Sequence, residues 1–389
     1  MPTRSKTSSK IVLCWINLGH YHVARASALA IKTDLTVLEF ARSHKIYGWE
    51  IDRSQLPFEV VTLSKGAWED QSMIDLAKKC WEILERIRPT GVVVPGYSNP
   101  IALAIAIWGC FRGVPRILMT ESTSGDRRRN QIKENLKSLL INWLFSGASY
   151  GGKPQLRYLE QLRFDIKKSA PFYNVVDNDF FATSSSAFRK GNQPSDFSLP
   201  PRYFLFVGRM APEKNIDLLL KAFAEYRRTG GQAHLVLAGE GPLRISLQTL
   251  AENLGVTSQC HFMGNLDARQ LLPLYAFADA FVLPSTSEPW GLVVNEAMAA
   301  GLPVIVSNHC GCAEDLVSDG QNGYLFDPGR KDQLAACLSR IDSLPVEQLA
   351  DMRRVSRNLI QVYSPENWAK HLVELIDTLQ EKTGRSPVE

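Results

Sequence analysis

Short apolar runs alternate with helical patterns along almost the whole of this 389-residue chain. Turn-forming residues bound each run, and a segment with helical periodicity follows most of them, which is typical of parallel sheets covered by helices. Strands are predicted at 10–17, 34–39, 58–63, 91–95, 115–119, 147–150, 202–207, 233–238, 259–263, 279–283 and 303–307. Helices are predicted at 22–32, 70–87, 99–111, 129–145, 153–163, 215–228, 243–254, 268–276, 291–300, 312–317, 331–340, 346–362 and 366–381.

The length allows two domains with separate cores. A polar stretch rich in Ser, Pro and Asn, from Thr183 to Pro201, marks the expected boundary between them. We therefore predict an α/β protein of two doubly wound domains in series, over residues 1–185 and 186–365. Ligands of such domains bind at the carboxyl ends of the strands.

The composition excludes several classes of protein. Hydrophobic residues make up 45% of the chain and charged residues 22%, which is ordinary for a soluble globular protein. A net charge of +4 gives no reason to expect a nucleic-acid partner. The seven cysteines are scattered and odd in number, as expected of free thiols in a reducing compartment. Cys310-Gly-Cys312 is too closely spaced, without a second pair, to predict a metal site.

Two apolar segments of the first domain are too short to be a targeting or membrane-spanning segment. The apolar run 11–18 is too short for the core of a signal peptide and has no small-residue cleavage site after it. The most apolar helical segment, 101–111, is too short to cross a bilayer. We expect a cytoplasmic protein.

Two acidic residues lie eight positions apart in Glu288-Pro-Trp-Gly-Leu-Val-Val-Asn-Glu296. A helix beginning near Gly291 would point the N–H groups of Gly291, Leu292 and Val293 out of its positive end, which favours an anion. The two carboxylates would flank this phosphate-sized site and accept hydrogen bonds from sugar hydroxyls. A nucleotide-sugar fits the arrangement. Taken alone, the spacing fits equally well a surface Glu followed by an amphipathic helix.

Four ordered segments between about residues 200 and 365 closely resemble the donor site of retaining GT-B glycosyltransferases of the family-4 type (glycosyl transferases group 1). The segments are Phe206-Val-Gly-Arg-Met-Ala-Pro-Glu-Lys-Asn215, Leu237-Ala-Gly-Glu-Gly-Pro242, the run from Phe281 to Ser307, and the run from Gly311 to Phe326. A match at four ordered motifs is far more specific than a match at any one of them.

The resemblance implies a GT-B fold, in which two Rossmann-like domains face a deep cleft. The N-terminal domain, 1–185 with a last helix from about 366 to 389, would bind the acceptor, and residues 186–365 would bind the donor. The implied reaction moves a hexose from a nucleotide-sugar to a glycan or lipid-linked acceptor with retention of configuration, in polysaccharide or glycoconjugate synthesis. UDP-glucose or another UDP-hexose is the expected donor, ahead of GDP-mannose, and no cofactor is expected.

Arg209 and Lys214 would hold the donor diphosphate in this family, beside Gly208. Transfer releases a diphosphate with new negative charge, which fixed cations and a helix N-terminus stabilise as it forms. Two cations can replace a divalent metal in this role, so we expect metal-independent transfer. The acceptor hydroxyl would attack from the face that the diphosphate leaves, and the departing phosphate would take its proton.

The remaining donor contacts are also implied by the resemblance. Glu296 would bind the ribose hydroxyls, and Glu288 would position the sugar. The backbone at Asn265 and Leu266 would contact the base.

The first domain offers weaker signals. Gly19 and His20 lie where the first strand meets the first helix, and we expect them to face the diphosphate and the acceptor. His22 and Arg25, inside the helix, have a structural or an acceptor-side role. Acceptor candidates follow two later strands: Tyr97, Ser98, Asn99 and Glu121. The cleft His that the family often has in the first of these loops is absent, so the general base stays open.

The segment 127–145 combines basic residues with leucines and aromatic residues, from Arg127 to Phe145. Such a helix can lie on an anionic membrane. We predict a possible peripheral contact at the inner face of the cell membrane, although a helix packed on its own sheet explains the pattern equally well.

Three other functions fit parts of the pattern. A GT-B epimerase or sugar phosphorylase, or a synthase acting on a small sugar phosphate, shares the two domains. An NAD-dependent oxidoreductase would need G-x-G-x-x-G, which the chain lacks. A non-catalytic nucleotide-sugar-binding protein would not need Arg209, Lys214, Glu288 and Glu296 together.

Overall fold

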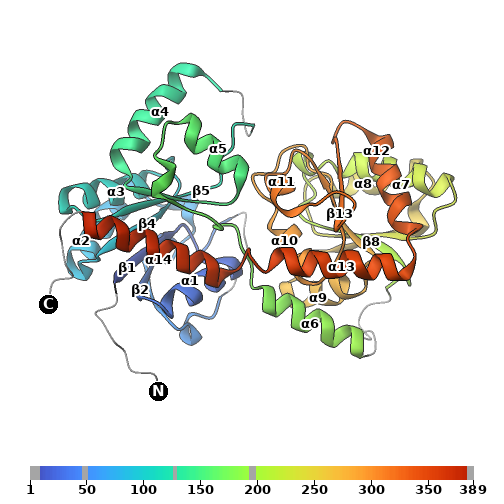
Figure 1. Ribbon diagram of the computed structural model, residues 1–389, viewed down its shortest axis with the longest axis horizontal. Coiled ribbons are helices and arrows are strands. Elements are labelled where there is room, and N and C mark those ends of the chain that lie inside the picture. Colours follow the sequence, from blue (N-terminus) through green and yellow to red (C-terminus); the bar gives the residue numbers. More distant parts are fainter. Residues whose placement is uncertain (1–8, 46–50, 126–128, 192–198, 383–389) are drawn as a thin grey trace. The chain divides into compact units, whose positions relative to one another are not determined.

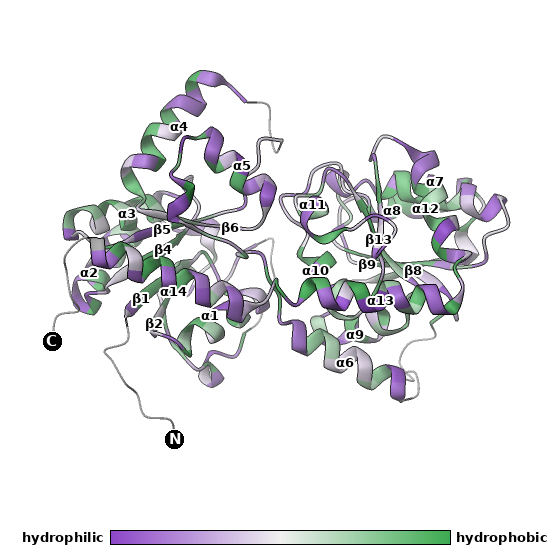
Figure 2. Cartoon of the chain, in the orientation of Figure 1, coloured by the Kyte–Doolittle hydropathy of each residue, from purple (hydrophilic) through white to green (hydrophobic). Residues whose placement is uncertain are grey.

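The computed structural model describes residues 9–45, 51–125, 129–191 and 199–382 (Figure 1). The chain divides into two compact units. One comprises Met1–Val176 with Ser364–Glu389, and the other comprises Asp177–Tyr363. Each unit contains one parallel sheet, and in the view coloured by hydropathy the central strands are largely hydrophobic while the outer helices carry hydrophilic stripes (Figure 2).

The first sheet has the order β3-β2-β1-β4-β5-β6-β7 and is parallel throughout. Its strands are β1 (Lys10–Trp15), β2 (Asp34–Glu39), β3 (Glu59–Thr62), β4 (Gly91–Pro95), β5 (Arg116–Thr120), β6 (Gly147–Tyr150) and β7 (Ser169–Ala170). The strand order reverses between β1 and β4. Loops that leave these two neighbouring strands diverge, which opens a crevice for a ligand at their carboxyl ends.

The helices of the first unit are α1 (His20–Ala30), α2 (Met73–Ile87), α3 (Pro100–Arg112), α4 (Gln131–Leu144), α5 (Lys153–Gln161) and α14 (Pro365–Lys382), with 3₁₀ turns at Arg53–Gln55, Trp68–Asp70 and Ile166–Lys168. Because the β1–β2 crossover runs along the sheet in the opposite direction to the later ones, right-handed connections put α1 on one face and α2, α3 and α4 on the other.

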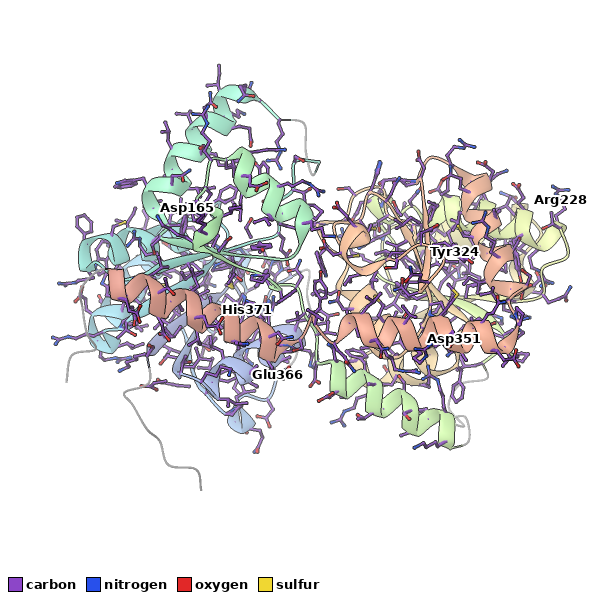
Figure 3. All side chains as sticks on the ribbon, viewed as in Figure 1. Asp165, Arg228, Tyr324, Asp351, Glu366 and His371 are labelled. Atoms are coloured by element: carbon purple, nitrogen blue, oxygen red, sulfur yellow. The ribbon has the colours of Figure 1, made fainter. Side chains whose placement is uncertain are left out.

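Helix α14 belongs to the first unit although it is the last in sequence (Figure 3 labels Glu366 and His371 on it). Trp368 is fully buried, and its indole Nε1 donates to Ser149 Oγ at 3.0 Å. Gln380 donates to the carbonyl of Thr90 at 2.8 Å. The helix lies so close to the sheet that a Cβ on Gly91 or Gly147 would come within 3.3 Å of its side chains.

The second sheet has the order β10-β9-β8-β11-β12-β13 and is also parallel. Its strands are β8 (Tyr203–Val207), β9 (His234–Ala238), β10 (Cys260–Gly264), β11 (Ala280–Leu283), β12 (Val304–Ser307) and β13 (Gly323–Phe326). Its helices are α6 (Asn178–Lys190), α7 (Ile216–Arg228), α8 (Arg244–Asn253), α9 (Ala268–Phe277), α10 (Leu292–Ala299), α11 (Ala313–Leu316), α12 (Lys331–Asp342) and α13 (Val346–Ile360), with 3₁₀ turns at Pro212–Lys214 and Thr257–Gln259. Here the order reverses between β8 and β11.

The polar stretch that we expected to separate the domains is partly helical. Residues up to Lys190 continue helix α6, so Thr183 lies inside a helix, and residues 192–198 fall outside the described part of the chain. Asp177 caps α6 by accepting from the N–H of Phe180 at 2.9 Å, and Phe181 packs edge-on against Tyr275. A capped start and a buried aromatic residue outweigh the low helix propensity of the serines. The units therefore meet at Val176 and Asp177, nine residues before the boundary expected at 185.

Two histidines face each other on neighbouring strands of the second sheet. His234 Nδ1 on β9 lies 2.9 Å from His261 Nε2 on β10. Burial lowers the pKa of both rings below the ordinary value of 6.5, assisted by Arg227 at His234 and by His234 at His261. The unfolded chain therefore binds more protons than the folded chain once the pH falls through about 6.5, and the free energy of unfolding falls with it.

We expect the wild-type protein to lose more unfolding free energy between about pH 7.5 and about pH 5.5 than the variant H234Q/H261Q. Urea denaturation at the two pH values measures this difference. His22, which is also buried, is present in both proteins and cancels from the comparison. Equal losses in the two proteins would show that the pair does not titrate abnormally.

Candidate active site

The loops after β8 and β11 meet at the point where the second strand order reverses. The backbone N–H of Thr286 donates to the carbonyl of Glu213 at 2.9 Å. Asn215 Nδ2 donates to the carbonyls of Pro284 at 3.1 Å and Pro328 at 3.0 Å. These bonds fix the two loops side by side, so residues far apart in sequence are held together at the carboxyl edge of the sheet.

Lys214 and Glu288 form an ion pair between these loops. Their side chains are 18% and 15% exposed, so solvent screens the pair only in part. Arg209 is 54% exposed and donates from Nη2 to Glu213 Oε1 at 2.6 Å. Each predicted cation thus has a carboxylate partner on or beside its own loop. A bound anion would have to draw the cations from these partners.

Helix α10 begins beside the ion pair. Its cap residue, Gly291, has φ +105°, and a Cβ there would lie 2.9 Å from the Leu283 side chain, so both conformation and space favour glycine. No side chain caps the helix, and the first-turn N–H groups, including those of Leu292 and Val293, point outward. The predicted start of this helix, near 291, is within one residue of the structure.

The loop that carries Glu288 is held through its backbone. The N–H of Gly311 donates to the carbonyl of Glu288 at 2.9 Å, and the N–H of Cys312 donates to that of Trp290 at 3.1 Å. The Trp290 indole donates to Asn295 Oδ1 at 2.9 Å, out of contact with solvent. The backbone of Glu288 is therefore held in place by hydrogen bonds in addition to the ion pair of its carboxylate.

Glu296 is more buried than the sequence suggested. Only 4% of the residue is exposed, and the hydroxyl of Tyr275 on α9 donates to its Oε2 at 2.6 Å. Glu288 and Glu296 thus flank the start of α10 in different environments. Glu288 is partly exposed and ion-paired, whereas Glu296 is buried and hydrogen-bonded.

Cys310 and Cys312 lie against this loop. Burial raises the pKa of both thiols above its ordinary range, with smaller contributions from Glu288 and, at Cys312, from Cys310. Both therefore stay protonated at neutral pH, and neither is a thiolate nucleophile.

Gly239 and Gly241 let two backbones approach each other. A Cβ on Gly239 would lie 2.0 Å from the carbonyl oxygen of Gly208, and one on Gly241 would lie 2.4 Å from that of Met210. Their φ angles of +139° and +158° are also unfavourable for other residues. The motif after β9 therefore supports the loop that carries Arg209. Next to it, the carbonyl of Gly264 accepts from the N–H of Gly239 at 2.7 Å, which leaves Asn265 and Leu266 at the edge of β10.

The corresponding edge of the first unit contains Gly19 and His20. Gly19 has an ordinary φ of −123°, and its N–H donates to His22 Nδ1 at 2.9 Å, so this N–H is already bonded. His22 packs on Trp15 with ring centroids 4.6 Å apart, and burial, then Arg25, lowers its pKa well below the ordinary value. His20 is exposed at the start of α1.

Arg25 has a structural environment. It is buried, donates to the carbonyl of Tyr173 at 2.8 Å, and lies 4.3 Å from the centroid of that ring. These contacts tie α1 to the segment before the second unit.

Glu39, at the end of β2, is buried and holds a loop of the candidate site. The sequence analysis did not predict this role. Its carboxylate accepts from the N–H of Leu18 at 2.9 Å, from Thr62 Oγ1 at 2.8 Å and from Arg53 Nη2 at 2.5 Å. It thereby fixes the loop that carries Gly19. An acid twenty positions after Gly19, at the end of a strand, was the available signal.

The acceptor candidates divide into two groups. Asn99 Oδ1 caps α3, accepting from Ile101 at 2.8 Å, which commits this oxygen to the helix. Tyr97 lies 3.4 Å from Ser122, hydroxyl to hydroxyl, and Ser98 and Glu121 are exposed on the same two loops.

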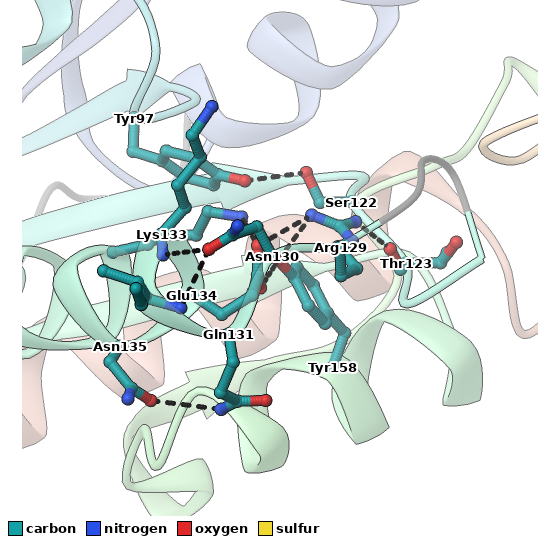
Figure 4. A network of polar contacts seen from close by, with 12 residues as sticks. Tyr97, Ser122, Thr123, Arg129, Asn130, Gln131, Lys133, Glu134, Asn135 and Tyr158 are labelled. Atoms are coloured by element: carbon teal, nitrogen blue, oxygen red, sulfur yellow. Dashed lines mark hydrogen bonds and ion pairs between the residues drawn. The ribbon is translucent and has the colours of Figure 1, made fainter.

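Tyr158 on α5 is the centre of a polar network that reaches these loops (Figure 4). Its hydroxyl accepts from Lys137 at 2.6 Å and from Arg129 at 2.7 Å, and donates to Glu134 at 2.5 Å. Burial and Glu134 raise the pKa of Tyr158, so it remains a hydroxyl. The predicted basic residues Arg127 and Arg128 lie outside the described residues.

The sequence contains one Asp-x-Asp motif, Asp177-Asn178-Asp179. Asp177 is the cap of α6, and Asn178 Nδ2 donates to the carbonyls of Ile360 and Tyr363 at 3.0 Å each. The motif therefore organises the start of a helix and joins it to the end of α13 and the segment after it.

The second unit is similar to a known protein family. A model described as Glycosyl transferases group 1 matches residues 189–359, which contain the whole second sheet. Residues 189–359 therefore match this family. The match confirms the resemblance read from the four sequence motifs.

Several curated proteins are similar to this chain over part of its length. An uncharacterized glycosyltransferase, MJ1607, of Methanocaldococcus jannaschii is 34% identical over 184 residues, 47% of each chain. An alpha-D-kanosaminyltransferase of Streptomyces kanamyceticus is 28% identical over 238 residues, 59% of this chain and 61% of its own. The alignments thus span about half to three fifths of these relatives.

Solved structures extend the likeness to both units. Anabaena Alr3699/HepE in complex with UDP and glucose has a TM-score of 0.71 at 17% identity, covering 96% of this chain and 99% of that one. A glycosyltransferase from Rickettsia africae has a TM-score of 0.73 at 14% identity, covering the same shares. The fold is therefore GT-B, with two Rossmann-like domains, as predicted. Within the described residues, every helix is too short or too polar to cross a bilayer.

Proposed function

We propose that the chain is a retaining glycosyltransferase that moves a hexose from a nucleotide-sugar to a glycan or lipid-linked acceptor. The observation that carries the proposal is the Lys214–Glu288 pair at the strand-order reversal, beside Arg209 and the uncapped start of α10. Two cations and a helix N-terminus at one edge of a doubly wound sheet suit a diphosphate leaving group.

In this proposal Arg209 and Lys214 bind the diphosphate beside Gly208, assisted by the N–H groups at Gly291, Leu292 and Val293. They stabilise the charge that develops when the sugar–phosphate bond breaks, without a metal ion. The acceptor hydroxyl attacks on the face that the diphosphate leaves, and a departing phosphate oxygen takes its proton. The rate then depends on charge stabilisation more than on any protein base.

The other residues position the substrates. Glu288 contacts the donor sugar and Glu296 the ribose hydroxyls, while the backbone at Asn265 and Leu266 contacts the base. Gly19 of the first unit completes the donor contacts. The acceptor contacts are His20, Tyr97, Ser98, Asn99 and Glu121.

We propose a UDP-hexose, with UDP-glucose first, as the donor. Structures similar to this chain are described with UDP and glucose or with UDP-2-fluoro glucose bound. A relative in Mycolicibacterium smegmatis is described as GDP-mannose-dependent, which makes GDP-mannose the donor to compare against.

Thermal unfolding with UDP, GDP, ADP, UDP-glucose, UDP-N-acetylglucosamine and GDP-mannose tests the donor site. A ligand that binds only the folded state raises the melting temperature by mass action. We expect UDP and one UDP-sugar to raise it selectively, with and without EDTA. If none of the six ligands raises it, the donor-site proposal fails, and if EDTA abolishes the shift, metal-free binding fails.

We further propose that α4 contacts the inner face of the cell membrane. Its exposed side chains Ile132, Leu136, Leu139 and Trp143 are 62–72% exposed and fall on one side of the helix, opposite the buried Ile141 and Leu144. The apolar stripe therefore faces away from the sheet, with Lys133 beside it. Relatives described as alpha-monoglucosyldiacylglycerol synthases support a lipid surface as its partner.

Flotation with anionic vesicles measures this contact. The variant L136S/W143S is expected to bind at least about tenfold more weakly than wild type, since burying one such side chain contributes roughly 1.5–3 kcal/mol. Ile31→Ser, at an exposed apolar residue directly after α1, is the control and should bind normally. Unchanged flotation of L136S/W143S, or a concentration-dependent dimer in its place, would overturn the membrane contact.

A further inference from the structure

The network around Tyr158 lies at the ligand-binding edge of the first sheet. Tyr97 follows the end of β4 by two residues, and Ser122 follows the end of β5 by two residues. Lys137 Nζ is 5.4 Å from the centroid of the Tyr97 ring, and Arg129 donates to the carbonyl of Thr123 in the loop after β5. The cations of the network therefore border the two loops that carry the acceptor candidates.

Positive charge exceeds negative charge in this network. Among the ion pairs of the described residues, Arg129 and Lys137 both pair with Glu134, at 3.4 and 2.6 Å. The three side chains are only 16–23% exposed, so water screens them weakly. Lys133, one turn before Lys137, adds a third cation in the close-up view (Figure 4). A weakly screened surplus of positive charge is stabilised by a bound anion.

The donors at this edge match a phosphate group. A guanidinium and an ammonium form short, charge-assisted hydrogen bonds to phosphate oxygens. The hydroxyls of Tyr97 and Ser122 contact each other at 3.4 Å, so one donates to the other and the pair supplies one further donor at the same edge. A phosphate offers enough oxygen atoms to engage several of these groups together, whereas a neutral sugar would leave the surplus charge unmatched.

We propose that Arg129 and Lys137 bind a phosphate group carried by the acceptor. The assignment of this phosphate to the acceptor rests on the proposed function. The binding of phosphate to Arg129 and Lys137 does not depend on it. Glu134 competes with the phosphate for both cations and sets the affinity of the site. The phosphate belongs either to a free sugar phosphate or to a lipid headgroup, and both present the same chemistry to these two side chains.

Phosphate binding by the full chain is measured first, by calorimetric titration of inorganic phosphate and of glucose 6-phosphate, with glucose as the uncharged control. Lys137→Gln is expected to weaken phosphate binding about tenfold, as expected for loss of one charge-assisted hydrogen bond. Glu134→Gln is expected to tighten it, because the competing carboxylate is gone. Tyr158→Phe removes the central hydroxyl, keeps both cations, and is expected to bind phosphate.

These variants separate binding from structural support. If the network only joins α4 to α5, all three variants should lower the melting temperature. Their phosphate affinities should then not follow the order expected above. Weaker phosphate binding by Glu134→Gln, or equal affinities of wild type and Lys137→Gln, would overturn the proposal. The titration does not require catalysis, so it can succeed even if the donor-site proposal fails.

Two competition experiments then distinguish the two sources of the phosphate. Vesicles of phosphatidylcholine containing phosphatidylinositol are compared with glucose 6-phosphate in solution, each as competitor of inorganic phosphate. Competition by glucose 6-phosphate alone assigns a soluble acceptor, and competition by the vesicles alone assigns a lipid headgroup. If neither competes, the site does not accept organic phosphates and the proposal is wrong.

Discussion

Replacing Lys214 with Ala is expected to lower kcat by about 10³, because the cation that we propose to stabilise the leaving diphosphate is lost. Lys214 is held in a half-buried position by Glu288, where its charge is only partly screened. Its interaction with the diphosphate strengthens as charge develops, so the loss falls on kcat more than on KM. Initial rates with UDP-glucose, or with the donor that the thermal panel selects, give both parameters.

Lys221→Ala is the matched control. Lys221 lies seven residues away on α7, is exposed, and pairs with Asp217 at 3.0 Å. It carries the same charge on the same unit, so general electrostatic effects are equal in the two variants. Near-wild-type kcat for Lys214→Ala would remove Lys214 from the catalytic proposal. A rise in KM alone would assign it to uniform binding of the donor.

Replacing Trp368 with Ala is expected to destabilise the first unit by about 3–5 kcal/mol, the usual cost of deleting a buried aromatic side chain. Trp368 is completely buried and also satisfies Ser149 on β6. The change should therefore loosen α14 and expose the glycine-lined face of the sheet. Chemical denaturation measures the loss, and hydrogen exchange locates it.

Faster exchange is expected in peptides from β6 and unchanged exchange in peptides from β11, since the two strands belong to different units. Trp143→Ala is the matched control, because Trp143 is exposed on α4 and a change there should cost no more than about 0.5 kcal/mol. Equal destabilisation by the two variants would contradict the docking of α14.

Most of the two sheets could be predicted from the sequence because buried parallel strands leave continuous apolar runs. β2 and β4, for example, were predicted with their observed bounds. β7 has only two residues, and β13 is a half-buried strand of four, so neither gives a clear run. Helix α6 was missed because its serines resemble a linker, and only contacts with Tyr275 reveal its buried side.

The candidate site could also be predicted only in part. Arg209, Lys214 and the start of α10 could be located because motifs fix the order of loop, turn and helix. The direct pairing of Lys214 with Glu288 could not, since 74 residues separate them and only the reversal of strand order between β8 and β11 brings them together. Likewise, the environments of Glu39 and Arg25 depend on residues from other elements, which periodicity does not encode.

The chain crosses between the two units twice, after Val176 and after Tyr363. During synthesis the first sheet emerges from the ribosome long before α14, its last packing partner. Its glycine-lined face stays uncovered while all of the second unit is made. The second unit, which is continuous in sequence, can complete its core before the first one does. Multidomain chains usually fold domain by domain from the N-terminus. Here we expect the second unit to finish folding first, because the first unit is completed only when α14 packs on its sheet.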